Sequence, residues 1–275
     1  LRTLLDLAAI NQPPFVISNG LSGGLLPAPL MPRSRQPEAT RAQAVAGLAA
    51  AKARKGRTYL PLEAFLRACR GQDVGAELQP PPVRERDAFK NTVRRTGAGT
   101  VDDGGLYALT EMWGPAGEEG SPIVVYARVE DGFAPLVSDA LHDLARTGYG
   151  RRISAGYGQV RLIEWAPTHD LDEEISDANG FVTLSNFCPA AGDPTRGYYR
   201  TLVKYGRLGD ERSTMEGVSP FKRPLIQIAA GSCFYAERPA PYYGRIVSGV
   251  HPRLGDVFQY GFAFAVPVVL PGTQD

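Results

Sequence analysis

Residues 148–158 read GYGRRISAGYG, with four glycines in two Gly-Tyr-Gly triplets. Glycine has no Cβ, so this segment predicts a glycine-rich turn whose bare backbone another backbone can approach closely. The segment before the loop has apolar residues at helical spacing, namely Val137, Leu141 and Leu144. The segment after it, QVRLIEW (159–165), alternates apolar and polar residues as a half-buried strand does. A strand-like run, 121–130, precedes the helix, so the predicted order is strand, helix, glycine loop, strand.

This order excludes two nucleotide-binding interpretations of the glycines. A dinucleotide site places Gly-x-Gly-x-x-Gly directly after a strand, so that a helix N-terminus faces the pyrophosphate. Here the loop follows a helix, whose C-terminal end carries the opposite partial charge, and five residues separate the two glycine pairs. The chain also lacks the Gly-x-x-x-x-Gly-Lys-Ser/Thr motif of an NTPase phosphate loop.

Two interpretations of the loop stay open on physical grounds. Bare backbone N–H groups together with Arg151 and Arg152 suit the phosphates of single-stranded RNA, which they would hold without reading bases. The alternative is a wide hairpin turn with no ligand. Tyr149 and Tyr157 are suited to stacking on bases, but hydrophobic residues flanked by glycines more often pack into the core, and we expect packing for both.

Composition describes a globular protein with a sizeable core. Of its 275 residues, 43% are hydrophobic and 21% are charged. No apolar run approaches the roughly 20 residues needed to cross a bilayer, so we expect no membrane partner. The three cysteines, Cys69, Cys188 and Cys233, lie far apart and form no CxxC pair. This usage favours a reducing cytoplasm and argues against both a disulfide framework and a structural zinc site.

The charge is unevenly distributed, although the formal net charge is only +1. Residues 33–57 carry seven Arg or Lys against the single Glu38, and residues 146–161 carry four Arg and no acid. The acids gather elsewhere, most densely in DLDEEISD (170–177). One-sided segments of this kind give a neutral protein a basic face, or are simply solvated loops.

Strands and helices alternate in two consecutive blocks, which predicts an α+β protein with two related lobes. Helices are expected at 37–54 and at 60–71, the second ending at Gly71. A Pro-rich linker, 78–87, separates these from the strand-like run 104–113. The acidic segment 167–179 is expected to join the lobes. The strands expected after it are GFVTLSNFCP, YYRTLVKYG, PLIQIAAGSCFY, RIVSGV and VFQYGFAFAVPVVLP.

Several stretches in order resemble the RAMP superfamily, the ferredoxin-like RNA-binding subunits of CRISPR effector complexes. The glycine loop resembles that family's loop between the last helix and last strand of a ferredoxin-like unit. Together the stretches look like the fourth subunit of type III-A Csm complexes, over most of the chain from 15 to 268. The others that carry the resemblance are FVISNGLSGGLLPAPLMP, FKNTVRRTGAGTVDDGGLY, LSNFCPA, SPFKRPLIQIAAGSCF and QYGFAFAVPV.

The resemblance implies two ferredoxin-like (RRM-like) lobes with antiparallel sheets, a glycine-rich loop and a thumb-like insertion. The N-terminal lobe would be 1–166, the linker 167–179 and the C-terminal lobe 180–275. The family begins with a strand and a Gly-rich turn that are not visible before Leu1, so we expect the first strand of lobe one to be missing from this sequence.

The resemblance also implies a non-catalytic, cytoplasmic RNA-binding subunit without a cofactor. Its partners would be the 5′ handle of the guide RNA (crRNA), target RNA near the guide 5′ end, the large signature subunit and a backbone RAMP subunit. The family motifs fall on three sets of residues: Gly148, Gly150, Arg151, Arg152, Ser154, Gly156 and Gly158 on the loop; Asn91, Arg94 and Thr96 on the thumb-like element; and Lys222, Arg223, Gly231 and Ser232 on the second-lobe signature.

Catalysis has few candidates, because a guide-processing ribonuclease usually needs a general acid or base, most often His. The histidines are His142, His169 and His251. We expect His142 to be a surface or packing residue, His169 to sit in an acidic linker rather than a metal site, and His251 to have no partner. Asp102 and Asp103 fit ordinary turn chemistry. A guide-processing endoribonuclease of the same fold, and a scaffold that contacts only proteins, are the alternatives to an RNA-binding subunit.

Overall fold

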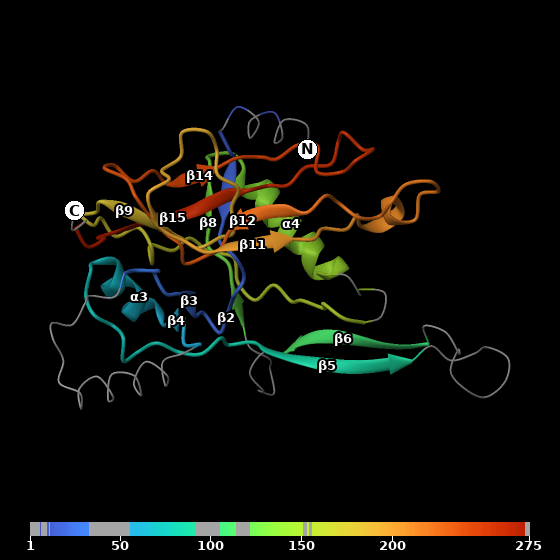
Figure 1. Ribbon diagram of the computed structural model, residues 1–275, viewed down its shortest axis with the longest axis horizontal. Helices are drawn as coiled ribbons and strands as arrows, with labels where there is room; N and C mark the ends of the chain where they lie inside the picture. Colours follow the sequence, from blue (N-terminus) through green and yellow to red (C-terminus); the bar gives the residue numbers. More distant parts are fainter. Residues whose placement is uncertain are drawn as a thin grey trace.

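The structure is a computed structural model that describes residues 6, 10, 12–32, 56–91, 105–113, 122–150, 153 and 156–272 (Figure 1). Helices stand beside antiparallel strands, so the expected α+β class is confirmed. The helix expected at 37–54 lies outside the described residues.

In chain order the elements are β1 (Phe15–Ile17), β2 (Leu21–Ser22), β3 (Leu26–Pro27), β4 (Tyr59–Leu60), α3 (Leu62–Cys69), β5 (Arg84–Asn91), β6 (Leu106–Trp113), β7 (Ile123–Val124), β8 (Ala127–Val129), α4 (Ala134–Thr147), β9 (Gly180–Thr183), β10 (Gly197–Tyr198), β11 (Thr201–Lys204), the 3₁₀ turn η2 (Asp210–Ser213), β12 (Leu225–Ile228), β13 (Cys233–Tyr235), β14 (Tyr242–Gly244) and β15 (Phe262–Val268).

The largest sheet has five antiparallel strands in the order β10-β13-β9-β15-β14. Its strand β15 reads FAFAVPV, and every residue except Pro267 is buried. A short continuous apolar run of this kind is typical of a strand covered on both faces. Each large side chain buried there stabilises the fold by about 1.5–3 kcal/mol.

One hydrophobic core joins the two halves of the chain. It packs residues from 16–69 against Val182, Leu184 and alternate side chains of β15, from Phe262 to Val268. Helix α3 buries four residues of one stripe, Ala64, Phe65, Ala68 and Cys69, toward this core. The Cys69 carbonyl accepts a 2.7 Å hydrogen bond from Val269 N–H just beyond β15. As expected, the helix is followed by Gly71, whose φ is 77°.

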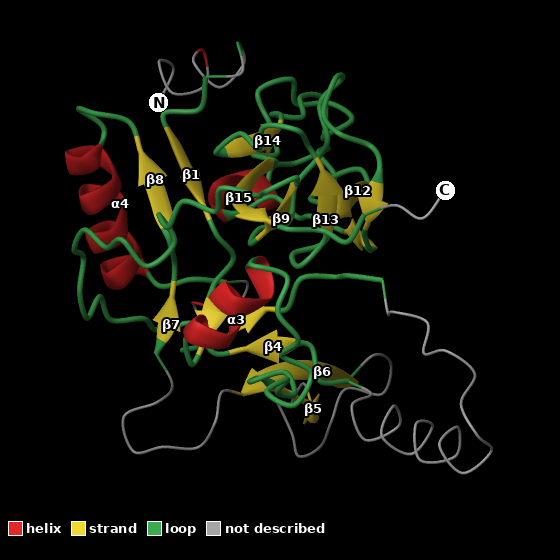
Figure 2. Cartoon of the chain, turned by 90° about the vertical axis from the view of Figure 1, so that its left-hand side faces the viewer, coloured by secondary structure: helices red, strands yellow, loops and turns green. Residues whose placement is uncertain are grey.

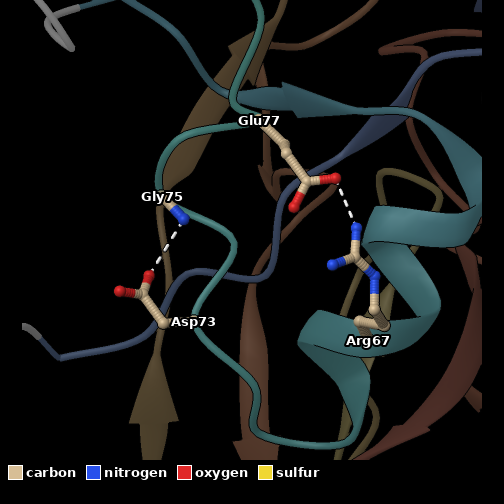
Figure 3. Close-up of polar contacts among 4 residues, drawn as sticks. All are labelled: Arg67, Asp73, Gly75 and Glu77. Carbon is tan, nitrogen blue, oxygen red and sulfur yellow. Dashed lines mark hydrogen bonds and ion pairs between the residues drawn. The ribbon is translucent and has the colours of Figure 1, made fainter.

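The turn after α3 is held by two polar contacts (Figure 3). The guanidinium of Arg67 forms an ion pair with Glu77, and a carboxylate oxygen of Asp73 accepts a 2.9 Å hydrogen bond from Gly75 N–H. The ion pair is half-exposed, so it contributes at most about 1 kcal/mol. After this turn the chain reaches Gln79, which forms an antiparallel β-bridge with Tyr59.

The strand expected at 121–130 is divided into β7 and β8, which pair with β2 and β1 respectively. At the interruption Ser18 N–H donates a 2.8 Å hydrogen bond to Tyr126 C=O, and the Ser18 hydroxyl accepts a 3.0 Å hydrogen bond from Tyr126 N–H. Figure 2 shows α4 alongside β8, which in turn lies beside β1. Helix α4 confirms the predicted periodicity, with Val137, Leu141 and Leu144 half-buried.

Three strand predictions are wrong in detail. Residues 159–165 form no strand, and their Ile163 is exposed, because no described strand lies alongside to pair with them. The segment 245–250 makes only one bridge, Val247 to Gln259. Conversely, β5 begins at Arg84, inside the expected linker 78–87, because β6 supplies a complete pairing partner.

The acidic segment 167–179 packs on the core. Leu171 is buried in it, Glu173 pairs with Arg70 of the α3 turn, and the side chain of Asn179 hydrogen-bonds both Leu270 N–H and Leu270 C=O. The division into two ferredoxin-like lobes on either side of this segment stays a prediction. No described helix is long and apolar enough to span a membrane.

Candidate nucleic-acid interface

The glycine loop is closed at its base by the backbone. Tyr149 N–H donates a 2.8 Å hydrogen bond to Gly158 C=O, and only Gly148 lies between Tyr149 and the end of α4 at Thr147. A Cβ on Gly158 would lie 1.8 Å from Tyr149 O, and a Cβ on Gly148 would lie 3.1 Å from Gly158 O. These two glycines therefore permit a neck that no other residue fits.

All four glycines of the loop have positive φ: 86° at Gly148, 114° at Gly150, 82° at Gly156 and 72° at Gly158. These φ values fit the predicted glycine-rich turn. Gly150 and Gly156 face open space, unlike the two glycines of the neck. Arg151, Arg152 and Ser154 lie outside the described residues, so their part in the site stays a prediction.

The expectation that both tyrosines pack into the core is wrong. Tyr149 exposes 72% of its surface. Tyr157 is partly exposed and reaches the β5–β6 hairpin, where its hydroxyl donates a 2.6 Å hydrogen bond to the Glu111 carboxylate. A tyrosine beside a glycine in a surface loop has no covering layer available, so Tyr149 faces solvent.

Glu111 connects the glycine loop to a third residue. Its Oε1 atom lies 3.3 Å from Nζ of Lys90, which stands on the neighbouring strand. Hydrogen bonding with Tyr157, and then with Glu111, raises the pKa of Lys90. Lys90, Glu111 and Tyr157 form a three-residue latch between hairpin and loop.

The β5–β6 hairpin is the element that the family pattern assigns to a thumb. Eight residue pairs join its strands, from Arg84 with Trp113 to Asn91 with Leu106, and it runs along one side of the molecule (Figure 1). Asn91 ends β5 and is exposed. Arg94 and Thr96 lie outside the described residues.

Lys222 of the second-lobe signature lies near Lys204 of β11. Burial and the charge of nearby Lys204 lower the pKa of Lys222. Gly206 makes room for the Lys222 stem, since a Cβ there would lie 2.9 Å from Lys222 Cδ. Arg223 is exposed. Two close ammonium groups repel one another, and a bound anion such as phosphate would relieve that repulsion.

Gly231 and Ser232 are used for contacts inside the protein, and their contact with RNA stays a prediction. Gly231 has a φ of 85°, and its carbonyl accepts a 2.8 Å hydrogen bond from Leu30 N–H. Ser232 is 1% exposed, and its hydroxyl donates to Ala229 C=O and accepts from Arg200 N–H. The pair fixes the N-terminal segment and β11 against the large sheet.

The histidines differ in environment. His142 is exposed on α4, as expected, and its Nδ1 lies 2.8 Å from Ser138 O. His169 is exposed beside Asp172, and no described group of three or more His, Cys, Asp or Glu side chains is placed to hold a metal. The expectation for His251 is wrong. It is buried, its Nε2 lies 2.8 Å from Ser219 O, and its Nδ1 accepts hydrogen bonds from the N–H groups of Arg253 and Leu254.

Sequence reasoning missed the latch and Lys204. The signal for Lys90 and Glu111 was available, because alternate residues of paired strands share a face. Tyr157 offered no such signal, since its contact depends on where the loop lies. Lys204 and Lys222 are brought together by the pairing that extends β11–β12, which includes the hydrogen bond from Lys222 N–H to Gly206 C=O.

No family model matches the chain, and no curated protein matches it. Several solved structures match it. The chain is similar to a chain of a Csm1–Csm4 cassette in complex with cA4, at 20% identity and a TM-score of 0.53, covering 99% of this chain and 84% of that one. The cassettes with AMPPNP and with pppApA match at 21% identity over the same shares, with TM-scores of 0.52 and 0.53. The chain has the fold of a Csm1–Csm4 cassette chain. At this identity the likeness shows the fold, and it agrees with the resemblance found in the sequence.

Proposed function

We propose that this chain is the RNA-binding subunit of a type III-A CRISPR interference complex, in which it holds the 5′ handle of the guide RNA. The observation that carries the proposal is the closed neck of the glycine loop. Its bare turns present backbone N–H groups that a phosphate chain can approach closely, and Arg151 and Arg152 belong to the same loop.

The positive side chains supply binding affinity, and the backbone N–H groups of the loop fix the position of the RNA. Lysine and arginine neutralise phosphates and release counterions, so affinity should fall steeply with salt. Lys204 and Lys222 form a second anion-binding position in the C-terminal half. The latch holds the β5–β6 hairpin beside the loop, which suits a thumb that reaches target RNA near the guide 5′ end.

The likeness over 99% of the chain supports a place in a cassette of two proteins, as the relatives' names describe. The proposed neighbours are a large signature subunit and a backbone RAMP subunit. The proposed lobes are ferredoxin-like, and the subunit itself is non-catalytic.

The test is binding to a guide RNA that carries the repeat-derived 5′ handle, measured by fluorescence anisotropy over a salt series. Reversing two phosphate contacts, with Arg151→Glu and Arg152→Glu, should reduce the salt slope by 2 × 0.7, or about 1.4. Arg238→Glu, in the loop between β13 and β14, is the matched single-charge control. RNA with a scrambled handle should bind more weakly to the wild type. Unchanged affinity and slope in the double variant would contradict the proposed site.

The same RNA tests the enzyme alternative. The wild-type protein should leave it intact after incubation. Discrete cleavage that is lost in His142→Ala would instead identify an endoribonuclease and overturn the proposal.

A further inference from the structure

The two faces of the β5–β6 hairpin have different surroundings. Residues on alternate positions share a face. The inner face includes Lys90 and Glu111 of the latch. The outer face consists of Glu85, Asp87, Phe89, Asn91, Leu106, Ala108, Thr110 and Met112, and all eight are exposed.

The outer face is apolar and acidic. Phe89 exposes 73% of its surface, Leu106 69% and Met112 74%. Its charges are the carboxylates of Glu85 and Asp87, and none of its eight residues is a cation. Its carboxylates repel phosphates, and large apolar side chains are exposed beside them, so the chemistry of this face fits a protein partner with an apolar centre and a positive charge.

A surface of that description lies on the same chain, at the β11–β12 hairpin. Val203 pairs with Ile226, Arg207 bridges Phe221, and Tyr205 shares the face by alternation. We call these five residues the tyrosine face. Tyr205 is 79% and Ile226 67% exposed, and the Arg207 guanidinium lies 5.7 Å from the centroid of the Phe221 ring.

We propose that the outer face of β5–β6 docks onto the tyrosine face of a second copy of this chain. Both are faces of two-stranded antiparallel ribbons, which pack face to face at about 10 Å. Apolar side chains would meet at the centre, and Glu85 and Asp87 would meet Arg207.

The strands β5 and β6 lie apart from β12 in both views (Figures 1 and 2). The two faces consist of different residues, so the contact is heterologous. Each copy offers one face of each kind, and copies therefore add head to tail. The inference goes beyond the proposed RNA-binding function. The two share Asn91 at the end of β5, and the variants that test the contact leave Asn91 unchanged. Two short ribbons bury an area at the low end of specific interfaces, below about 1,200 Å² in total, so we expect weak, concentration-dependent association.

The association can be measured by sedimentation velocity of the RNA-free protein. Concentrations from about 1 µM to about 1 mM cover the dissociation constants expected of such an interface. The wild-type sedimentation coefficient should rise with concentration. Glu85→Arg with Asp87→Arg should remain monomeric, as should Arg207→Glu. All three positions are exposed, and unchanged thermal melting would verify folding. Arg161→Glu, an exposed charge change elsewhere, should associate like the wild type.

A charge-swap mixture makes the test specific to these faces. The Glu85→Arg/Asp87→Arg variant has two positive faces and the Arg207→Glu variant has two negative ones. Mixed in equal amounts, they should associate again. A wild type that stays monomeric throughout would overturn the proposal, and so would single-face variants that associate normally or a mixture that stays dissociated.

Discussion

The Tyr157 hydroxyl donates a 2.6 Å hydrogen bond to the Glu111 carboxylate, across 46 positions of sequence. Tyr157 belongs to the neck of the glycine loop, and Glu111 belongs to the inner face of the β5–β6 hairpin. Because Glu111 also contacts Lys90 on the paired strand, one carboxylate fixes the loop to both strands of the hairpin. The two elements of the proposed RNA site therefore form one unit.

Tyr157→Phe should loosen this unit without unfolding the protein. The substitution removes a hydrogen bond to a charged acceptor at a partly exposed position, so global stability should change by about 1 kcal/mol or less. Amide hydrogen exchange in Leu106–Trp113 should quicken, and affinity for handle RNA should fall. Tyr149→Phe also removes a tyrosine hydroxyl from the loop. It should change neither the amide exchange rate nor the affinity for handle RNA. Equal amide exchange rates in Leu106–Trp113 for the Tyr157→Phe and Tyr149→Phe variants would contradict the proposed role of the latch.

Gly158→Ala should open the neck. A residue other than glycine at a φ of 72° is strained, and the added Cβ would collide with the Tyr149 carbonyl. The local cost is about 1–3 kcal/mol, and the Tyr149 amide should lose its protection from hydrogen exchange. Gly150→Ala is the matched control, because Gly150 also has positive φ but faces open space. It should leave the Tyr149 amide protected.

His251→Ala should destabilise the C-terminal half. It removes the partner of the Arg253 and Leu254 N–H groups and of the Ser219 carbonyl, and each of these partly buried hydrogen bonds contributes about 0.5–1.5 kcal/mol. Urea denaturation should show a loss of at least about 2 kcal/mol. The exposed His142→Ala should change stability by about 0.5 kcal/mol or less. Equal midpoints for the two variants would contradict the structural role of His251.

Alkaline pH should destabilise the fold. Burial raises the pKa of Cys233 from 9.0 to about 12, and burial, followed by the charge of Asp170, raises that of Tyr126 from 10.0 to about 12. Burial also raises the pKa of Cys69. Since the unfolded chain loses these protons first, stability is fully present below about pH 9 and falls as pH rises toward 12.

Urea denaturation at about pH 7.5, 9 and 10 would measure this loss. Each group contributes at most about 1.36 kcal/mol per pH unit between its unfolded and folded pKa. Combining Cys69→Ala with Cys233→Ala should flatten the dependence on pH, whatever the variant's absolute stability. An unchanged slope would mean that these thiols do not control it.

Local features were predictable from the sequence. Helix α4 follows from the spacing of Val137, Leu141 and Leu144, and the end of α3 follows from Gly71. Positive φ at the four loop glycines follows because each conformation depends on sterics within a few residues. The prediction that the loop lies after a helix was correct for the same reason.

Strand pairing and side-chain burial were harder to predict from the sequence. QVRLIEW alternates like a strand, yet a strand also needs a neighbour to accept its hydrogen bonds, and none of the described strands provides one. Ser232 belongs to a motif that suggested ligand contact, but its hydroxyl is used inside the protein. The partners of His251, at Ser219, Arg253 and Leu254, depend on how two loops meet.

By itself the sequence determined the α+β class, the two described helices and the glycine turns, because these depend on short-range sterics and periodicity. Only the tertiary structure decided which side chains meet: Tyr157 with Glu111, Lys204 with Lys222, and an outer hairpin face left bare. Such contacts join residues distant in the chain, and their energies depend on which surfaces are already buried.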